Sequence, residues 1–301
     1  MSFELKRKET VPEGIRRVVC ELIDDALKVL NDSAHKRVTD EAVHEARKCF
    51  KQARGALRLV RKELGKKIFD RENRTFRDAG RPLSEVRDAK VMVDTLDELA
   101  KHYEGQLSSG SFKQLRAALE ARRRKTRKRV LDENHATRAI VRNVRQVSQR
   151  VADWPLVHKG WKAIAPGLRQ TYAQGRDAMD AAIRDCTDEA FHEWRKRAKD
   201  VRYEIELLTR AWPEIMEPMA DAAHHLTDLL GQDHDLAVLQ DISENELKES
   251  VPEDEQELLK PLVAQRRADF QKEASELGRK IYAESDDEFV SRIHGYWKAW
   301  R

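Results

Sequence analysis

Two rows of basic side chains are the part of this sequence best suited to chemistry. Each row starts with a histidine and continues with arginine and lysine at intervals of one, three or four residues. The first stripe is His44, Arg47, Lys48, Lys51 and Arg54, and the second stripe is His192, Arg195, Lys196, Lys199 and Arg202. On a helix with about 100° per residue, each stripe lies on one face. Guanidinium and ammonium groups bind phosphate oxygens, and a protonated histidine adds a donor, so the stripes predict an anion-binding surface.

The charges of each stripe are segregated rather than mixed. Solvated helices usually mix acidic and basic residues, because opposite charges four residues apart stabilise a helix by roughly 0.2–0.5 kcal/mol. Like charges at the same spacing cost a similar amount unless an anion neutralises them. The first stripe continues to Arg58 and spans roughly 21 Å at 1.5 Å per residue, which suits a linear polyanion better than one phosphate. The alternative interpretation is the solvated face of an ordinary helix.

The stripes belong to an internal repeat. Residues 39–48 and 187–196 are identical at eight of ten positions, 148 residues apart. A second correspondence follows downstream at an offset of 147. It pairs Leu83, Asp88, Val91 and Asp94 with Leu230, Asp235, Val238 and Asp241. The repeat predicts two related units, residues 1–150 and residues 151–301, that together form one module.

An apolar seam accompanies each stripe at alternating spacings of three and four residues, which is the pattern that antiparallel helix bundles bury. Trp194 and Trp212 lie on the second seam and are expected in the core. The seams are Val43, Ala46, Phe50, Ala53, Leu57, Val60 and Leu64, and Phe191, Trp194, Ala198, Val201, Ile205, Leu208 and Trp212. They predict an all-α chain of two helical bundles.

Helical periodicity extends over nearly the whole chain, and no segment shows the alternation of a strand. We expect a helix break near Gly80–Pro82, because proline disfavours the helical conformation of the residue before it. The other helices expected here span residues 11–30, 40–64, 112–153, 188–211, 213–230, 233–248, 252–283 and 287–300, with a further one from about residue 156 that is disturbed at 166–167.

Composition excludes several classes of protein. Of the 301 residues, 37% are charged and only 40% are apolar, and no stretch of 18 apolar residues exists. We therefore expect neither a membrane span nor a signal peptide. Cys20, Cys49 and Cys186 are far apart, which indicates a reducing cytosol. Residues 1–213 carry a net charge of +15 and residues 214–301 carry −11, which indicates an anionic partner for part of the molecule.

The doubled H-x2-R-K-x2-K-x2-R motif resembles the CHAD family, the histidine-containing α-helical domains. The segments Glu72–Asp88 and Leu230–Asp235 support the resemblance, as does the opening Phe3–Arg17. The resemblance implies two four-helix bundles related by pseudo-two-fold symmetry, with basic faces that line a central cavity. It also implies binding of inorganic polyphosphate and a role in polyphosphate granules. We expect no catalysis, cofactor or metal, and the cysteines and the lack of a signal peptide predict a cytoplasmic location.

Ligand contacts carried over from the family by position are the ten residues of the two stripes. Arg16, Arg58, Arg87, Lys90 and Lys162 are further candidates by position. Some relatives join this module to a CYTH-type triphosphate-hydrolysing domain that requires an E-x-E-x-K strand. Residues 4–8 do not match that motif, so we expect a binding module without hydrolytic activity.

Two other functions compete with this interpretation. The same basic surface suits RNA or another nucleic acid, with Arg122–Arg129 as a second contact or as a solvated helix. His234 and Asp235 resemble the metal-binding doublet of phosphohydrolases; alternatively, Asp235 caps a helix that begins after Gly231. A zinc site of the H-E-x-x-H type is not expected, because Lys48 occupies the place of its second histidine.

Overall fold

The computed structural model describes residues 3–31, 38–108, 110–133 and 136–301, and contains helices and no strand within these ranges. The α-helices are α1 (Val11–Asn31), α2 (Asp40–Leu59), α3 (Arg61–His102), α4 (Lys113–Arg127), α5 (Ala136–Val151), α6 (Ala165–Asp185), α7 (Asp188–Leu208), α8 (Pro213–Asp241), α9 (Glu253–Ile281) and α10 (Asp286–Trp300). Short π-helical turns, η1 (Lys128–Glu133) and η4 (Ile242–Glu246), and 3-10 turns, η2 (Trp161–Ala163) and η3 (Thr209–Ala211), extend or connect them. The expected all-α class is confirmed.

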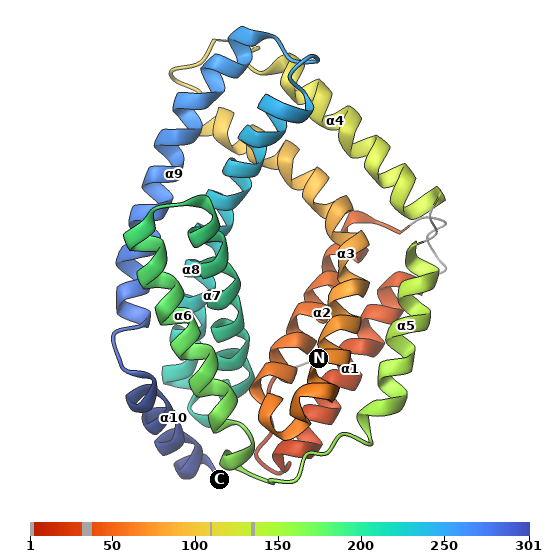
Figure 1. Cartoon of the computed structure of the whole chain (residues 1–301), viewed down its shortest axis with the longest axis vertical. Coiled ribbons are helices and arrows are strands. Elements are labelled where there is room, and N and C mark those ends of the chain that lie inside the picture. Colours follow the sequence, from red (N-terminus) through yellow and green to blue (C-terminus); the bar gives the residue numbers. More distant parts are fainter. Residues whose placement is uncertain (1–2, 32–37, 109, 134–135) are drawn as a thin grey trace.

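The helices form two arms that lie on opposite sides of the molecule and meet at its lower end in the view of Figure 1. The first half, α1–α5, makes one arm, and the second half, α6–α10, makes the other. The arms also meet at the far end of the molecule, where the Glu255 carboxylate accepts hydrogen bonds from the backbone N–H groups of Gln114 and Leu115 at the start of α4. Among the described residues, no helix combines the length and apolar character needed to span a bilayer. The division of the chain at residue 150 stays a prediction.

The repeated motif produces the same local structure in both halves. Thr39 and Thr187 are N-caps whose side chains accept from the backbone N–H of Ala42 and Ala190. An Asp-Glu pair in each first turn complements the positive end of the helix dipole. The apolar seam that follows is buried in each half except at Trp212, with Trp194 fully enclosed. These features fix the rotation of α2 and α7, and therefore the direction in which each stripe points.

The two halves pack against each other where α2 crosses α7. Gly55 and Tyr203 occupy equivalent repeat positions and contact each other, and a Cβ at Gly55 would lie 2.7 Å from Tyr203 Cβ. Glycine therefore permits the close approach of the two helices. One turn further, Arg58 Nε forms a buried ion pair with Asp200 Oδ2 at 3.0 Å. Contact between equivalent positions is what a two-fold relation between the halves requires.

Several expected helix ends differ from the structure. α3 continues through Pro82, and the non-helical residue within it is Gly65, whose φ of 69° suits glycine. α8 is one helix from 213 to 241, so Asp235 lies in its interior, and the expected cap after Gly231 is wrong. Packing of both helices along their neighbours outweighs the local cost of proline and glycine.

Trp212 is also not in the core. The seam of α7 ends at Leu208, and a 3-10 turn follows before α8 begins. Trp212 precedes α8 with an extended backbone and is 44% exposed. The long helix expected over residues 112–153 is divided into α4, η1 and α5.

Candidate anion-binding site

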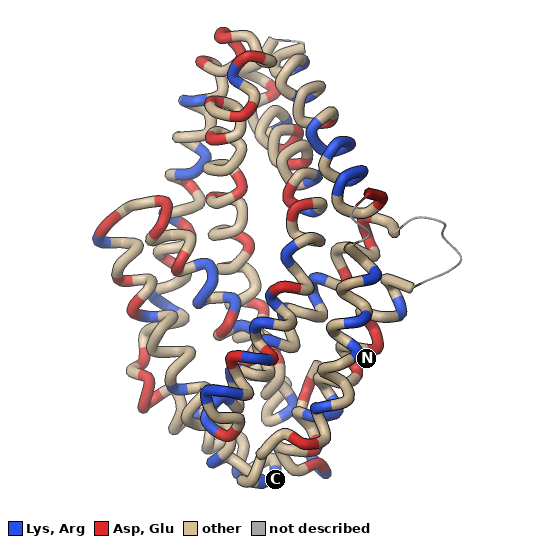
Figure 2. Tube along the Cα trace, turned by 45° about the vertical axis from the view of Figure 1, so that its right-hand side comes forward, with Lys and Arg blue, Asp and Glu red and all other residues tan. Residues whose placement is uncertain are grey.

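A cavity of about 600 Å³ lies between α2 and α3 of the first half and α7 and α8 of the second. Its cations come mainly from α2 and α7, whereas all of its carboxylates come from α3 and α8. The cationic residues lining it are Arg47, Lys48, Lys51, Arg87, Arg195, Lys199, Arg202 and Arg266. The carboxylates are Asp88, Asp94, Glu98, Asp228 and Asp235. Figure 2 shows lysine and arginine positions gathered where the halves meet and along α4. The central cavity therefore combines the two basic stripes in one space.

Lys51 and Lys199 occupy equivalent positions and approach each other from opposite halves. Neither ammonium group forms an ion pair with a carboxylate of the described residues. Burial in the cavity, together with charge repulsion from Arg47 and Arg195, lowers the pKa of Lys51 to about 8. Burial also places the pKa of Lys199 well below its usual range, with Arg195 and Lys51 adding to the effect. Such a cluster gains most from an anion that neutralises it.

An aspartate on the neighbouring helix positions the arginine of each stripe. Arg47 Nη2 lies 3.3 Å from Asp88 Oδ1, and Arg195 Nη2 lies 3.9 Å from Asp235 Oδ1. These contacts leave other donors free. The buried Nε atoms of Arg47 and Arg195, and Nη1 of Arg87, have no hydrogen-bond partner in the described parts of the chain. Arg87 Nη1 also lies 3.6 Å from Asp94 Oδ2, so aspartates orient all three guanidinium groups.

Three histidines in or beside the cavity have a lowered pKa, which favours their neutral form. Burial and nearby cations lower the pKa of His44 and of His192. His192 packs against His234 with 4.4 Å between ring centroids, and burial together with Arg195 lowers the pKa of His234 to about 3. Neutral rings beside a cationic cluster gain protons when an anion binds.

His234 and Asp235, the doublet considered for metal binding, contact His192 and Arg195 instead. Within the described ranges, no group of three His, Cys, Asp or Glu residues is arranged to hold a metal ion. The adjacent cations oppose the approach of a divalent metal to this doublet.

Most of the residues expected at the site do line the cavity or open next to it. His44, Arg47, Lys48, Lys51, Arg87, Arg195, Lys199 and Arg202 line the central cavity, and Arg54 lines an adjacent groove. The remaining candidates lie outside these linings. Three of them form ion pairs: Arg58 with Asp200, Lys90 with Asp94 and Lys196 with Glu193. Arg16 donates a hydrogen bond to the Trp154 carbonyl, and Lys162 belongs to η2. His192 packs on His234.

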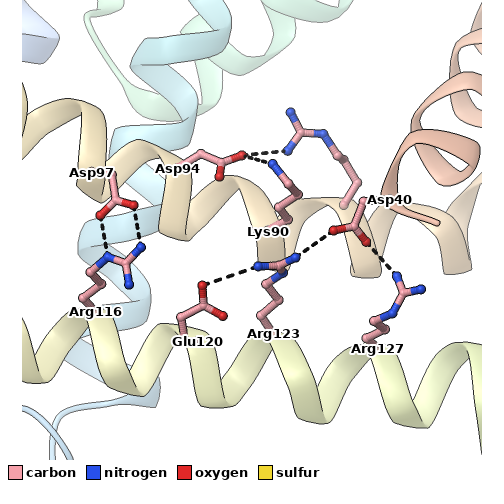
Figure 3. A network of polar contacts seen from close by, with 9 residues as sticks. Asp40, Lys90, Asp94, Asp97, Arg116, Glu120, Arg123 and Arg127 are labelled. Atoms are coloured by element: carbon pink, nitrogen blue, oxygen red, sulfur yellow. Dashed lines mark hydrogen bonds and ion pairs between the residues drawn. The ribbon is translucent and has the colours of Figure 1, made fainter.

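The basic run Arg122–Arg129 is mostly engaged in ion pairs that hold α4 in place. Arg123 and Arg127 bind the two carboxylate oxygens of Asp40, at the start of α2, at 2.8 and 2.7 Å (Figure 3). Arg122 pairs with Glu246, and Arg129 pairs with Glu85. These contacts give the run a structural role and reduce the charge that it presents to a ligand.

Sequence reasoning did not identify several lining residues. Asp88 and Asp235 could have been noticed in the sequence, because they recur at the same place in the repeat. Their ion pairs with Arg47 and Arg195 depend on the fold. Arg266 on α9 belongs to no motif, and Gln232 and Thr95 are isolated polar residues. Their place in the cavity depends on how the halves pack.

Comparison with known proteins agrees with this arrangement. The family model described as the CHAD domain matches residues 21–244, which include both stripes and both aspartates. A search of curated proteins gives no match. The family match covers most of the chain and all four helices around the cavity, and the chain therefore belongs to the CHAD domain family.

Proposed function

We propose that this protein binds inorganic polyphosphate in the central cavity and does not hydrolyse it. The observation that carries the proposal is the facing pair Lys51 and Lys199, half-buried and without a carboxylate partner among the described residues. Placing like charges together in a desolvated space is costly unless a ligand neutralises them. Membership of the CHAD domain family supports the same ligand class.

A chain of phosphates suits the cavity better than a single phosphate does. The cations of the two stripes extend along α2 and α7 over several helical turns, so successive phosphates of one polymer contact both halves. Arginine offers paired donors to phosphate oxygens, and lysine offers a compact charge. The neutral cavity histidine, His44, adds a donor once the anion has raised its pKa.

The first test is calorimetric titration of the full chain with long-chain polyphosphate at two salt concentrations, with an assay for released phosphate. We expect tight binding that weakens strongly at the higher salt concentration, because each neutralised phosphate releases counterions. Phosphate release that depends on added Mg²⁺ or Mn²⁺ and disappears in Asp235→Ala would instead support the phosphohydrolase alternative. If RNA displaces polyphosphate at matched phosphate concentration, nucleic acid is the preferred ligand.

The second test removes the two facing cations. Lys51→Met/Lys199→Met is expected to weaken binding of long-chain polyphosphate by about a hundredfold or more, because two charge-assisted contacts are lost. Arg124→Met/Lys125→Met is the matched control, since it removes two exposed cations of α4 for which no ion pair is seen in the described structure. Equal losses in the two variants would show that general charge, and not the central cavity, governs binding.

A further inference from the structure

A second basic cavity opens directly from the central cavity. This α2–α3 groove has a volume of about 540 Å³ and shares Arg47 and Lys51 with the central cavity. Its further cations are Arg54 on α2 and Arg77 and Arg81 on α3. Its lining includes no carboxylate. The central cavity and the α2–α3 groove therefore form one continuous row of cations.

The cationic side chains of the α2–α3 groove are available to bind a ligand. Arg54 Nε donates to Asn73 Oδ1 at 2.9 Å, which fixes the guanidinium group without neutralising it. Arg81 is exposed and forms no ion pair with the described residues, while Arg77 contacts only the exposed carboxylate of its neighbour, Asp78. Phe50 and Phe76 form the floor and are almost fully buried, so they supply shape rather than a stacking surface.

The equivalent positions of the second half have different chemistry and line the central cavity itself. At the repeat offset of 147, Arg77 and Arg81 correspond to His224 and Asp228, whose side chains pair at 3.4 Å. At the offset of 148, Arg54 corresponds to Arg202, which Glu206 neutralises at 2.6 Å. The second half thus places a carboxylate where the first places an arginine.

We propose that a polyphosphate chain leaves the central cavity on one side only, along the α2–α3 groove, with Arg77 and Arg81 as binding residues for the phosphates beyond the cavity. This inference rests on the proposed function. Asp228 repels a polyanion from the α8 side of the central cavity, so the polymer continues only on the side of the α2–α3 groove. Arg77 and Arg81 thereby determine a preference for long chains over short ones.

The test compares ligands of two lengths. Arg77→Glu/Arg81→Glu is titrated with tripolyphosphate, which the central cavity accommodates, and with long-chain polyphosphate, which extends into the α2–α3 groove. We expect long-chain affinity to fall roughly tenfold or more, and tripolyphosphate affinity to change by less than about twofold. Arg74→Glu/Arg142→Glu is the matched control, because both arginines are exposed and outside the cavity and groove linings.

A converse variant tests the asymmetry itself. Asp228→Arg gives the second half the cation that the first has at Arg81, and it is expected to strengthen long-chain binding several-fold. Tripolyphosphate affinity is expected to rise as well, because Asp228 lines the central cavity. Unchanged long-chain affinity in Arg77→Glu/Arg81→Glu, or equal losses for both ligands, overturns the one-sided path while leaving binding in the cavity intact. Absence of binding of either ligand to the wild type would instead refute the proposed function.

Discussion

The two halves share a helix cap, an apolar seam and a basic stripe, yet they differ where they meet. Lys51 and Lys199 are equivalent, and so are the pairs formed by Arg47 and by Arg195 with their aspartates. One or two turns further along α2, the first half has Arg58 where the second has Glu206. The similarity lies in the paired lysines and arginines of the cavity, and the differences lie at the interface and at Asp228 in the cavity wall.

This comparison shows how two halves that arise from an internal repeat can differ in the charges that they present. Lys51 and Lys199, and Arg47 and Arg195, have the same charge in both halves, so that both halves contribute to one cavity. The positions that differ supply an ion pair between the halves, Arg58 with Asp200, and an acidic position in the cavity wall at Asp228. A cavity to which both halves contribute equivalent residues can therefore have different charges on its two sides.

The largest expected effect on stability comes from the interface. Arg58→Ala leaves the buried Asp200 carboxylate without its partner and is expected to lower the free energy of unfolding by about 3 kcal/mol. Glu206→Ala changes the equivalent position, where the pair with Arg202 lies within one helix, and is expected to cost about 1 kcal/mol or less. Urea denaturation of both variants measures the difference; similar costs would contradict a special role for the interface pair.

A smaller change in the free energy of unfolding, of opposite sign, is expected when the cavity lysines are replaced. Lys51→Met/Lys199→Met removes unpaired cations and is expected to raise the free energy of unfolding by about 1–2 kcal/mol. The folded state lowers the pKa of both lysines below that of the unfolded chain, so their charge opposes folding at neutral pH and does so less as pH rises. Thermal denaturation without ligand gives the sign, and destabilisation would mean that the ammonium groups have stabilising partners.

Binding is expected to weaken as the solution becomes alkaline. Lys51 has a pKa of about 8 in the free protein, and a bound phosphate raises it. Binding then takes up protons, and affinity falls about tenfold between roughly pH 7.5 and 9. Titrations in buffers of different ionisation enthalpy measure the uptake. Lys51→Met/Lys199→Met is the control that lacks this dependence, and if it keeps the full pH dependence, other groups are responsible.

The smallest effects are expected at the aspartates that hold the arginines. Asp235→Asn removes a half-buried negative charge beside Arg195 and Lys199, and is expected to raise polyphosphate affinity about threefold to fivefold. Asp88→Asn acts at the equivalent but more exposed position, where solvent screens the charge, and is expected to gain about twofold or less. Reduced affinity in either variant would show that positioning the arginine matters more than repulsion of the ligand.

Local sequence patterns predicted much of the fold and of the site. The first seam from Val43 to Leu64 is buried throughout, because its spacing matches one helix face and one neighbouring layer. The stripe on the same helices necessarily faces another direction, and the repeat indicated that it occurs twice. The convergence of Lys51 and Lys199 depends on the crossing of α2 and α7, which the spacing of either helix alone does not determine.

The predictions that failed were those in which local preference competes with packing. Pro82 and Gly231 are helix-breaking in isolation, yet both lie inside long helices that pack along their neighbours. Trp212 continues the seam by spacing, but the helix that carries the seam ends before it. The charges of Arg123 and Arg127 were visible in the sequence, whereas their pairing with Asp40 required the fold.

The central claim is that both halves bind one ligand in one shared cavity. Calorimetric stoichiometry with tripolyphosphate tests it most directly, using the wild type and the single variants Lys51→Met and Lys199→Met. We predict one tripolyphosphate per chain, with each single variant weakening that same binding event. Two tripolyphosphates per chain, with each variant abolishing one and sparing the other, would contradict a shared site.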